Sequence, residues 1–175
     1  FIKGADVLLH AMALLHRQRL PVRLVVVGDG AERGALQALA KDLGISAITC
    51  FTGRVPRGAI YGAIKGFDIA VVPSREEGFG LSALEAMAGG VPVVASRVDA
   101  LQEVVQEGVT GLLFQGEDAA SLADSLARLL SDAGLRRAMG AAGVEHVARW
   151  YDTPAYRAKL AEMILSLGLP VQISS

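Results

Sequence analysis

The sequence has a single cysteine among its 175 residues, so an internal disulfide is excluded. Cys50 lies in an apolar stretch, and we expect it to be a small core residue rather than a nucleophile. No apolar run approaches the roughly 18 residues that a membrane-spanning helix needs. No N-terminal signal peptide is visible either. Together these absences predict a cytoplasmic protein.

Charge of one sign is also lacking. The net charge is −1 and the pI about 6.3, so no broad basic surface is expected and nucleic acid is not expected as a partner. The three histidines, His10, His16 and His146, do not have the spacing of metal ligands, and we expect no metal site. Apolar residues make up 52% of the chain, enough for the core of one globular domain.

The sequence does show strand patterns that alternate with helix patterns. This alternation predicts an α/β, Rossmann-like parallel sheet with helices on both faces. The run at 22–27 is apolar almost throughout, which is typical of a strand buried on both faces. We expect strands at 22–27, 48–52, 67–72, 91–95 and 111–114, and helices at 5–18, 32–43, 56–65, 81–88, 100–106, 118–131, 133–148 and 153–167. The predicted domain covers residues 1–167, and residues 168–175 form a tail without a pattern.

Four small residues follow predicted strands: Gly28, Gly53, Ser74 and Ser96. In a parallel sheet the carboxyl ends of the strands meet at one edge, and ligands bind there. The turn Gly28-Asp29-Gly30 lacks the spacing of a dinucleotide fingerprint and is expected to be a simple tight turn.

The most specific segment is Glu77-Gly78-Phe79-Gly80-Leu81-Ser82-Ala83-Leu84-Glu85. A strand, a glycine-rich turn and a helix start follow one another here, and exposed amides at a helix start attract phosphate. Two carboxylates would oppose phosphate, so we expect them to accept hydrogen bonds from sugar hydroxyls. For Glu77 alone, simple compensation of the helix dipole explains the acid equally well.

Two basic residues are further candidates. Lys3 precedes a predicted helix and could reach a diphosphate, and Arg54 follows a predicted strand end and could flank a base or a phosphate. Taken singly, each is typical of a solvated surface charge.

Together these residues resemble the nucleotide-sugar-binding half of a retaining GT-B glycosyltransferase of family 4, also called group 1. That family includes sucrose and glycogen synthases and many bacterial mannosyl- and glucosyltransferases. Lys3-Gly4, Val27-Gly28-Asp29-Gly30, Phe51-Thr52-Gly53 and the paired-glutamate segment 77–88 carry the resemblance. It continues through 92–96 and 108–111.

The resemblance implies a role for each candidate. Glu77, the catalytic candidate, would hold hydroxyls of the donor sugar, and Glu85 would bind the ribose. Amides of the glycine-rich turn would bind the diphosphate together with Lys3, and the backbone near Arg54 would meet the base. No metal or other cofactor is implied. The implied donor-binding residues are Lys3, Arg54, Val55, Gly78, Phe79, Gly80, Leu81 and Glu85.

Two departures from the family accompany the match. Asp99-Ala100 stands where the family usually has a Gly-Gly pair, which removes a close backbone approach to the donor sugar. The family's first strand should precede Lys3, so a gap is expected beside the 22–27 strand, unless another segment fills it. The resemblance also implies an N-terminal acceptor-binding domain, which we expect to lie outside this sequence, and any peripheral contact with a membrane would come only through it.

The sequence therefore predicts the donor-binding domain of a hexosyltransferase that moves a sugar from a nucleotide diphosphate to an acceptor. The isolated chain is expected to bind the donor weakly and to transfer nothing. Two alternatives stay open. One is a non-catalytic module that binds a nucleotide or sugar phosphate, and the other is a different GT-B enzyme such as a sugar-nucleotide epimerase.

Overall fold

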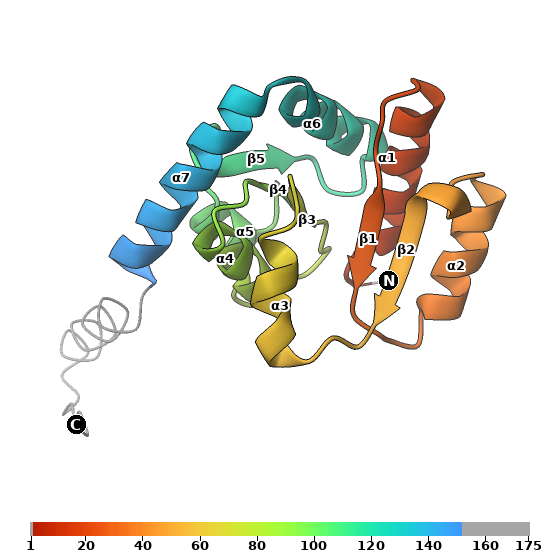
Figure 1. The fold of residues 1–175 in the computed structure, drawn as a ribbon, viewed down its shortest axis with the longest axis horizontal. Helices are drawn as coiled ribbons and strands as arrows, with labels where there is room; N and C mark the ends of the chain where they lie inside the picture. Colours follow the sequence, from red (N-terminus) through yellow and green to blue (C-terminus); the bar gives the residue numbers. More distant parts are fainter. Residues whose placement is uncertain (1, 152–175) are drawn as a thin grey trace.

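The computed structural model describes residues 2–151 (Figure 1). The predicted helix at 153–167, the tail at 168–175 and the predicted end of the domain lie outside the described residues.

The described elements follow the predicted order closely. The helix α1 and the strand β5 match their predicted bounds almost residue for residue, whereas β3 is shorter than predicted. The short 3-10 helix η1 was not predicted. The helices are α1 (Ala5–Arg17), α2 (Arg33–Asp42), η1 (Ser46–Ile48), α3 (Arg57–Ile64), α4 (Leu81–Ala88), α5 (Asp99–Val104), α6 (Ala119–Ser131) and α7 (Ala133–Trp150). The strands are β1 (Leu24–Val27), β2 (Thr49–Gly53), β3 (Ala70–Val72), β4 (Val93–Ser96) and β5 (Gly111–Phe114).

The strands form two separate parallel sheets. β1 pairs with β2, and β3, β4 and β5 form a three-stranded sheet in that order. Figure 1 shows β1 and β2 beside α1 and α2, apart from the other three strands. Within the described residues nothing pairs β1 with β3. The gap expected beside the first strand is therefore present, and no described segment fills it.

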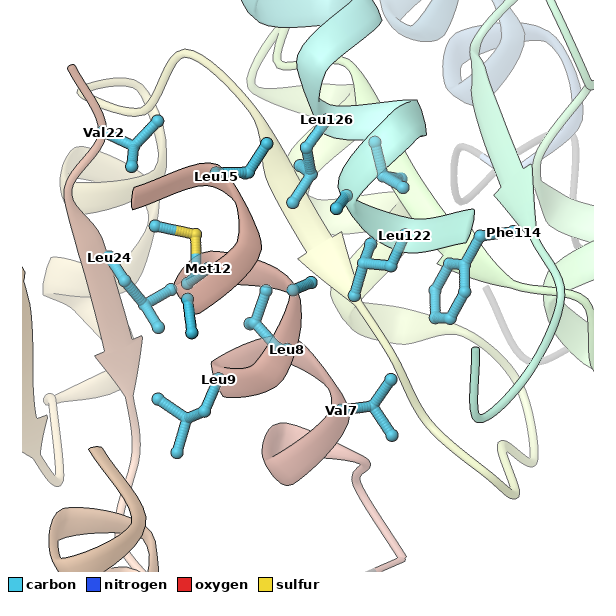
Figure 2. Packing of buried hydrophobic residues seen from close by; sticks show 14 of the residues in the cluster. Val7, Leu8, Leu9, Met12, Leu15, Val22, Leu24, Phe114, Leu122 and Leu126 are labelled. Atoms are coloured by element: carbon cyan, nitrogen blue, oxygen red, sulfur yellow. The ribbon is translucent and has the colours of Figure 1, made fainter. Parts of the chain in front are cut away.

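One hydrophobic core joins the two sheets through α1. Leu8, Leu9, Met12 and Leu15 of α1 are all buried, as the helical spacing predicts. Figure 2 shows this helix between Leu24 of β1 on one side and residues of α6 on the other. The same cluster contains Val94 of β4 and two residues of β5, Leu112 and Phe114. The helix α1 thus holds the two sheets together although no strand among residues 2–151 connects them.

A second core covers the other face of the three-stranded sheet. Val93 and Ala95 of β4 point into it and pack with Leu84 and Met87 of α4 and Leu101 of α5. Because alternate strand residues point to opposite faces, β4 is buried on both of its faces. Helices on both faces of a parallel sheet confirm the predicted α/β class.

Two predictions about burial are wrong, and both concern β1 and β2. Val25 and Val27 are 39% and 40% exposed, because helices α1 and α2 cover only the face to which Leu24 and Val26 point. Cys50 is exposed rather than in the core. An apolar run shows that a strand forms, but it does not show whether a helix covers both of its faces.

Among the described residues, no helix is both long enough and apolar enough to cross a membrane.

Candidate functional site

The paired-glutamate segment forms the end of the turn between β3 and α4 and continues through α4. Gly80 lies where the turn meets the helix. Gly80 is the N-cap of α4 and has a φ of 77°, in the left-handed region that favours glycine. A Cβ at this position would lie 3.3 Å from the Leu101 Cδ2 atom of α5. The backbone conformation therefore favours glycine here, and a side chain would also crowd Leu101.

The start of α4 presents main-chain donors. The helix's own hydrogen bonds begin at the N–H of Ala83, which donates to the Gly80 carbonyl at 3.0 Å. The amides of Leu81 and Ser82 come before this first bond, and no described side chain caps the helix. Leu81 and Phe79 are exposed, at 56% and 41%. The turn thus has the ordinary features of an anion-binding helix start.

Glu77 lies in this turn as a partly buried, well-satisfied carboxylate. Its side chain is 14% exposed, and its Oε2 atom accepts hydrogen bonds from Lys3 Nζ at 2.8 Å and Ser74 Oγ at 3.1 Å. Burial raises the pKa of Glu77, but these donors and the backbone N–H of Gly80 outweigh it and lower the pKa below its ordinary value. Glu77 is therefore ionised at neutral pH.

Lys3 reaches Glu77 because two loops approach each other closely. Gly4, the N-cap of α1, has a φ of 61° and packs against Pro73. A Cβ on Gly4 would collide with the Pro73 carbonyl oxygen. The Lys3 side chain is 68% exposed, so one end of the ion pair is solvated and the other is sheltered. The structure therefore brings together Lys3 and Glu77, which are 74 residues apart in the sequence.

Glu85 lies in the second turn of α4 and is half-buried. In the described part of the chain its carboxylate makes no hydrogen bond or ion pair with another side chain. Side chains of an α-helix tilt toward its N-terminus, so Glu85 leans toward the Gly80 turn.

Arg54 and Val55 lie elsewhere, just after the end of β2. Arg54 is exposed and Val55 is half-buried. There the N–H of Gly28, which follows β1, donates to the Gly53 carbonyl at 3.1 Å. These residues belong to the two-stranded sheet, and Lys3 and Glu77 lie at the end of the three-stranded sheet. The candidate residues therefore occupy the carboxyl edges of both sheets.

Sequence reasoning missed Arg75, which lies between Ser74 and Glu77. Its guanidinium donates two parallel hydrogen bonds to Asp6 of α1, at 2.9 and 2.8 Å, and a third to Glu117 at 2.9 Å. Its backbone N–H donates to the Ile2 carbonyl at 2.8 Å. No local pattern indicates this pairing, because Asp6 and Arg75 are 69 residues apart.

The Asp6–Arg75 pair should make the stability of the protein depend on pH in the acid range. Hydrogen bonds from Arg75 hold the pKa of Asp6 below its ordinary 3.8. The pair's contribution to the free energy of unfolding is therefore complete above pH 3.8. It is lost as the pH falls through the lower pKa that Asp6 has in the folded protein. We expect Asp6→Asn to lower the free energy of unfolding by about 1 kcal/mol at neutral pH. Below about pH 4 the urea midpoint of Asp6→Asn should decrease less with falling pH than that of the wild type. An equally steep decrease of the urea midpoint in Asp6→Asn and in the wild type would contradict this assignment.

A small polar hollow of about 200 Å³ lies beside the site. Residues that follow β3, β4 and β5 line it, among them Ser74, Arg97 and Gln115. The buried Ser96 hydroxyl donates to the Ser74 carbonyl, which ties the ends of β3 and β4 together. A hollow of about 250 Å³ beside α2 and β2 is lined by no titratable group. Among the described residues no group of His, Cys, Asp or Glu could hold a metal ion.

A sequence profile described as glycosyl transferases group 1 matches residues 2–146. The chain belongs to this family. It is 40% identical to the D-inositol 3-phosphate glycosyltransferase of Corynebacterium urealyticum, over 95% of this chain and 41% of that protein. The corresponding enzyme of Kribbella flavida is 42% identical over 83% of this chain. The chain thus spans about two-fifths of the length of these relatives.

Solved structures place the group 1 fold in the GT-B class. The sucrose-phosphate synthase of Thermosynechococcus elongatus matches 95% of this chain with a TM-score of 0.84 and 33% identity, over 42% of its own chain. HepE of Anabaena, solved in complex with UDP, matches 94% with a TM-score of 0.84 and 26% identity, over 46% of its own chain. The C-terminal domain of LpcC, a group 1 protein of Francisella tularensis, matches 87% with a TM-score of 0.79 and 28% identity, over 81% of that chain.

Proposed function

We propose that this chain is the donor-binding half of a retaining glycosyltransferase that moves a hexose from a nucleotide diphosphate to an acceptor. The observation that carries the proposal is the sheltered, ionised Glu77 carboxylate beside the Lys3 ammonium and the open start of α4. A carboxylate suits sugar hydroxyls, and an ammonium with helix-start amides suits a diphosphate. A nucleotide sugar has both sugar hydroxyls and a diphosphate, and the diphosphate is attached to the anomeric carbon of the sugar.

Each candidate residue then has a distinct role. Glu77 accepts hydrogen bonds from the donor sugar and orients its reacting carbon. Lys3 and the amides around Gly80 and Leu81 hold the diphosphate and stabilise the charge that grows on it as the bond to the sugar breaks. Glu85 accepts hydrogen bonds from the ribose. These positive groups take the place of a metal ion at the diphosphate.

The remaining roles fall at the second sheet and outside the chain. Main-chain groups near Arg54 and Val55 meet the base at the end of β2. HepE has been solved with UDP and glucose, which supports a nucleotide sugar as the donor. A further domain, which the longer relatives have room for, binds the acceptor. We expect a strand upstream of Ile2 to lie between β1 and β3, since the Ile2 carbonyl accepts a hydrogen bond from the N–H of Arg75, three residues after β3.

A non-catalytic module that binds a nucleotide sugar is the second candidate. Asp99-Ala100 favours it, because helix α5 begins at the position where the family usually has a Gly-Gly pair.

Titration calorimetry with UDP-, GDP- and ADP-sugars tests the donor assignment on the 175-residue chain. We expect one of the three to bind with a dissociation constant of about 0.1–1 mM, because a second domain normally closes the cleft. Affinity should be the same with Mg²⁺ and with EDTA. No binding by any of the three would refute the function, and efficient transfer by this chain alone would refute its assignment as one half of the enzyme. An assay of sugar transfer with a form of the protein that includes the proposed acceptor-binding domain distinguishes the two candidates: transfer supports the enzyme, and its absence supports the non-catalytic module.

A further inference from the structure

Arg75 connects three segments that border the candidate site. Its side chain binds Asp6 in the first turn of α1 and Glu117 in the loop after β5, and its backbone binds the chain at Ile2. The Asp6–Arg75 pair is sheltered, with side chains 23% and 27% exposed, whereas Glu117 is 68% exposed. Solvent therefore screens the bond to Asp6 less than the bond to Glu117.

This pair spans the same two loops as the Lys3–Glu77 pair. Asp6 follows Lys3 by three residues, and Arg75 precedes Glu77 by two. A guanidinium that binds a carboxylate through two parallel hydrogen bonds fixes both distance and angle, whereas an ammonium on a flexible stem fixes neither. The relative position of the two loops therefore depends on Arg75 more than on Lys3.

Donor binding makes this difference important. A diphosphate carries more negative charge than a carboxylate and competes with Glu77 for the Lys3 ammonium. When Lys3 turns to the diphosphate, its bond to Glu77 weakens. Asp6 and Arg75 are already paired with each other through two hydrogen bonds, so we expect their bond to stay in place and the two loops to keep their spacing.

We propose that Arg75 is a positioning residue of the donor site, which through Asp6 sets the spacing between Lys3 and Glu77. This inference rests on the function proposed above. It differs from a purely structural role in one consequence: Arg75 and Lys3 act on the same step. Loss of Arg75 lowers donor affinity even in a fully folded protein, and it reduces what Lys3 contributes.

The first test is a double-mutant cycle on donor affinity. Arg75→Lys keeps the charge but loses the two parallel bonds to Asp6. We expect both Arg75→Lys and Arg75→Met to lower the affinity for the nucleotide sugar about tenfold. Glu117→Gln is the matched control, because it leaves the bond to Asp6 intact, and its affinity should stay within twofold of the wild type. Lys3→Met should cost less in the Arg75→Met background than in the wild type. Far-UV circular dichroism at the assay temperature ensures that only folded variants are compared.

The second test needs no ligand. The pKa of Glu77 in the free chain, followed by carboxyl carbon NMR, reports how closely Lys3 is held. Arg75→Lys should raise it toward the ordinary value, and Glu117→Gln should leave it unchanged. Wild-type affinity and an unchanged Glu77 pKa in Arg75→Lys would overturn the inference. If the wild type binds no nucleotide sugar, the proposed function fails, and the Glu77 titration still decides whether Arg75 sets the spacing.

Discussion

Replacing Glu85 by alanine should reduce the affinity for the nucleotide sugar by roughly 10–100-fold. A hydrogen bond to a charged group contributes about 1.5–3 kcal/mol, which corresponds to that range. Glu85 is half-buried in the second turn of α4, and no other described side chain engages its carboxylate. Its removal therefore breaks no bond to a described side chain, and the loss should appear in binding rather than in stability. Calorimetry for affinity and urea denaturation for stability measure the two effects separately.

Glu76 provides the matched control for this substitution. It is an exposed acid in the same stretch, one residue before Glu77, and it has no role in the proposed site. Glu76→Ala should bind the donor as the wild type does. If Glu85→Ala and Glu76→Ala bind equally well, the ribose role assigned to Glu85 is wrong. A similar loss for the nucleoside diphosphate without its sugar would place the effect on the nucleotide side of the donor.

Local patterns predicted the elements well because each element is determined mainly by its own residues. The spacing of Leu8, Met12 and Leu15 is enough to define the buried face of α1. Glycines mark the ends of α4, where Gly80 and Gly90 both adopt left-handed conformations. Such signals act over a few residues and need no knowledge of the rest of the fold.

The exposed side chains of β1 and β2 show where local patterns fail. Val25 and Val27 look like core residues in the sequence, and so does Cys50 beside Phe51. Their exposure depends on whether a helix also covers that face, and the flanking helices α1 and α2 cover only the opposite one. Local composition is the same for a covered and an uncovered strand, so the sequence pattern could not separate the two.

The candidate site divides in the same way. The glutamates and glycines of the 77–85 segment form a recognisable motif because a strand, a turn and a helix follow each other directly. The contacts that orient the motif are long-range: Lys3 with Glu77, and Asp6 with Arg75. Lys3 was predicted only as a residue that could reach a diphosphate, and its bond to Glu77 appears only in the structure. A single sequence carries no record of such pairs.

Replacing Gly4 by alanine should be far more damaging than its size suggests, because Gly4 is the point where these long-range contacts meet. It is buried, its φ is 61°, and a Cβ would collide with the Pro73 carbonyl oxygen. Backbone cannot move aside as a flexible side chain can, so the two loops must separate. We expect a loss of about 2–4 kcal/mol in the free energy of unfolding, measured by urea denaturation.

Gly44→Ala separates the two causes of this loss. Gly44 also has a positive φ, 73°, but a Cβ there would meet nothing within 4 Å. It should therefore cost only the backbone strain, about 1 kcal/mol, and leave donor affinity unchanged. Gly4→Ala should in addition weaken donor binding, since separating the loops draws Lys3 away from Glu77. If the two substitutions cost the same and neither changes affinity, the contact between Gly4 and Pro73 does not maintain the site.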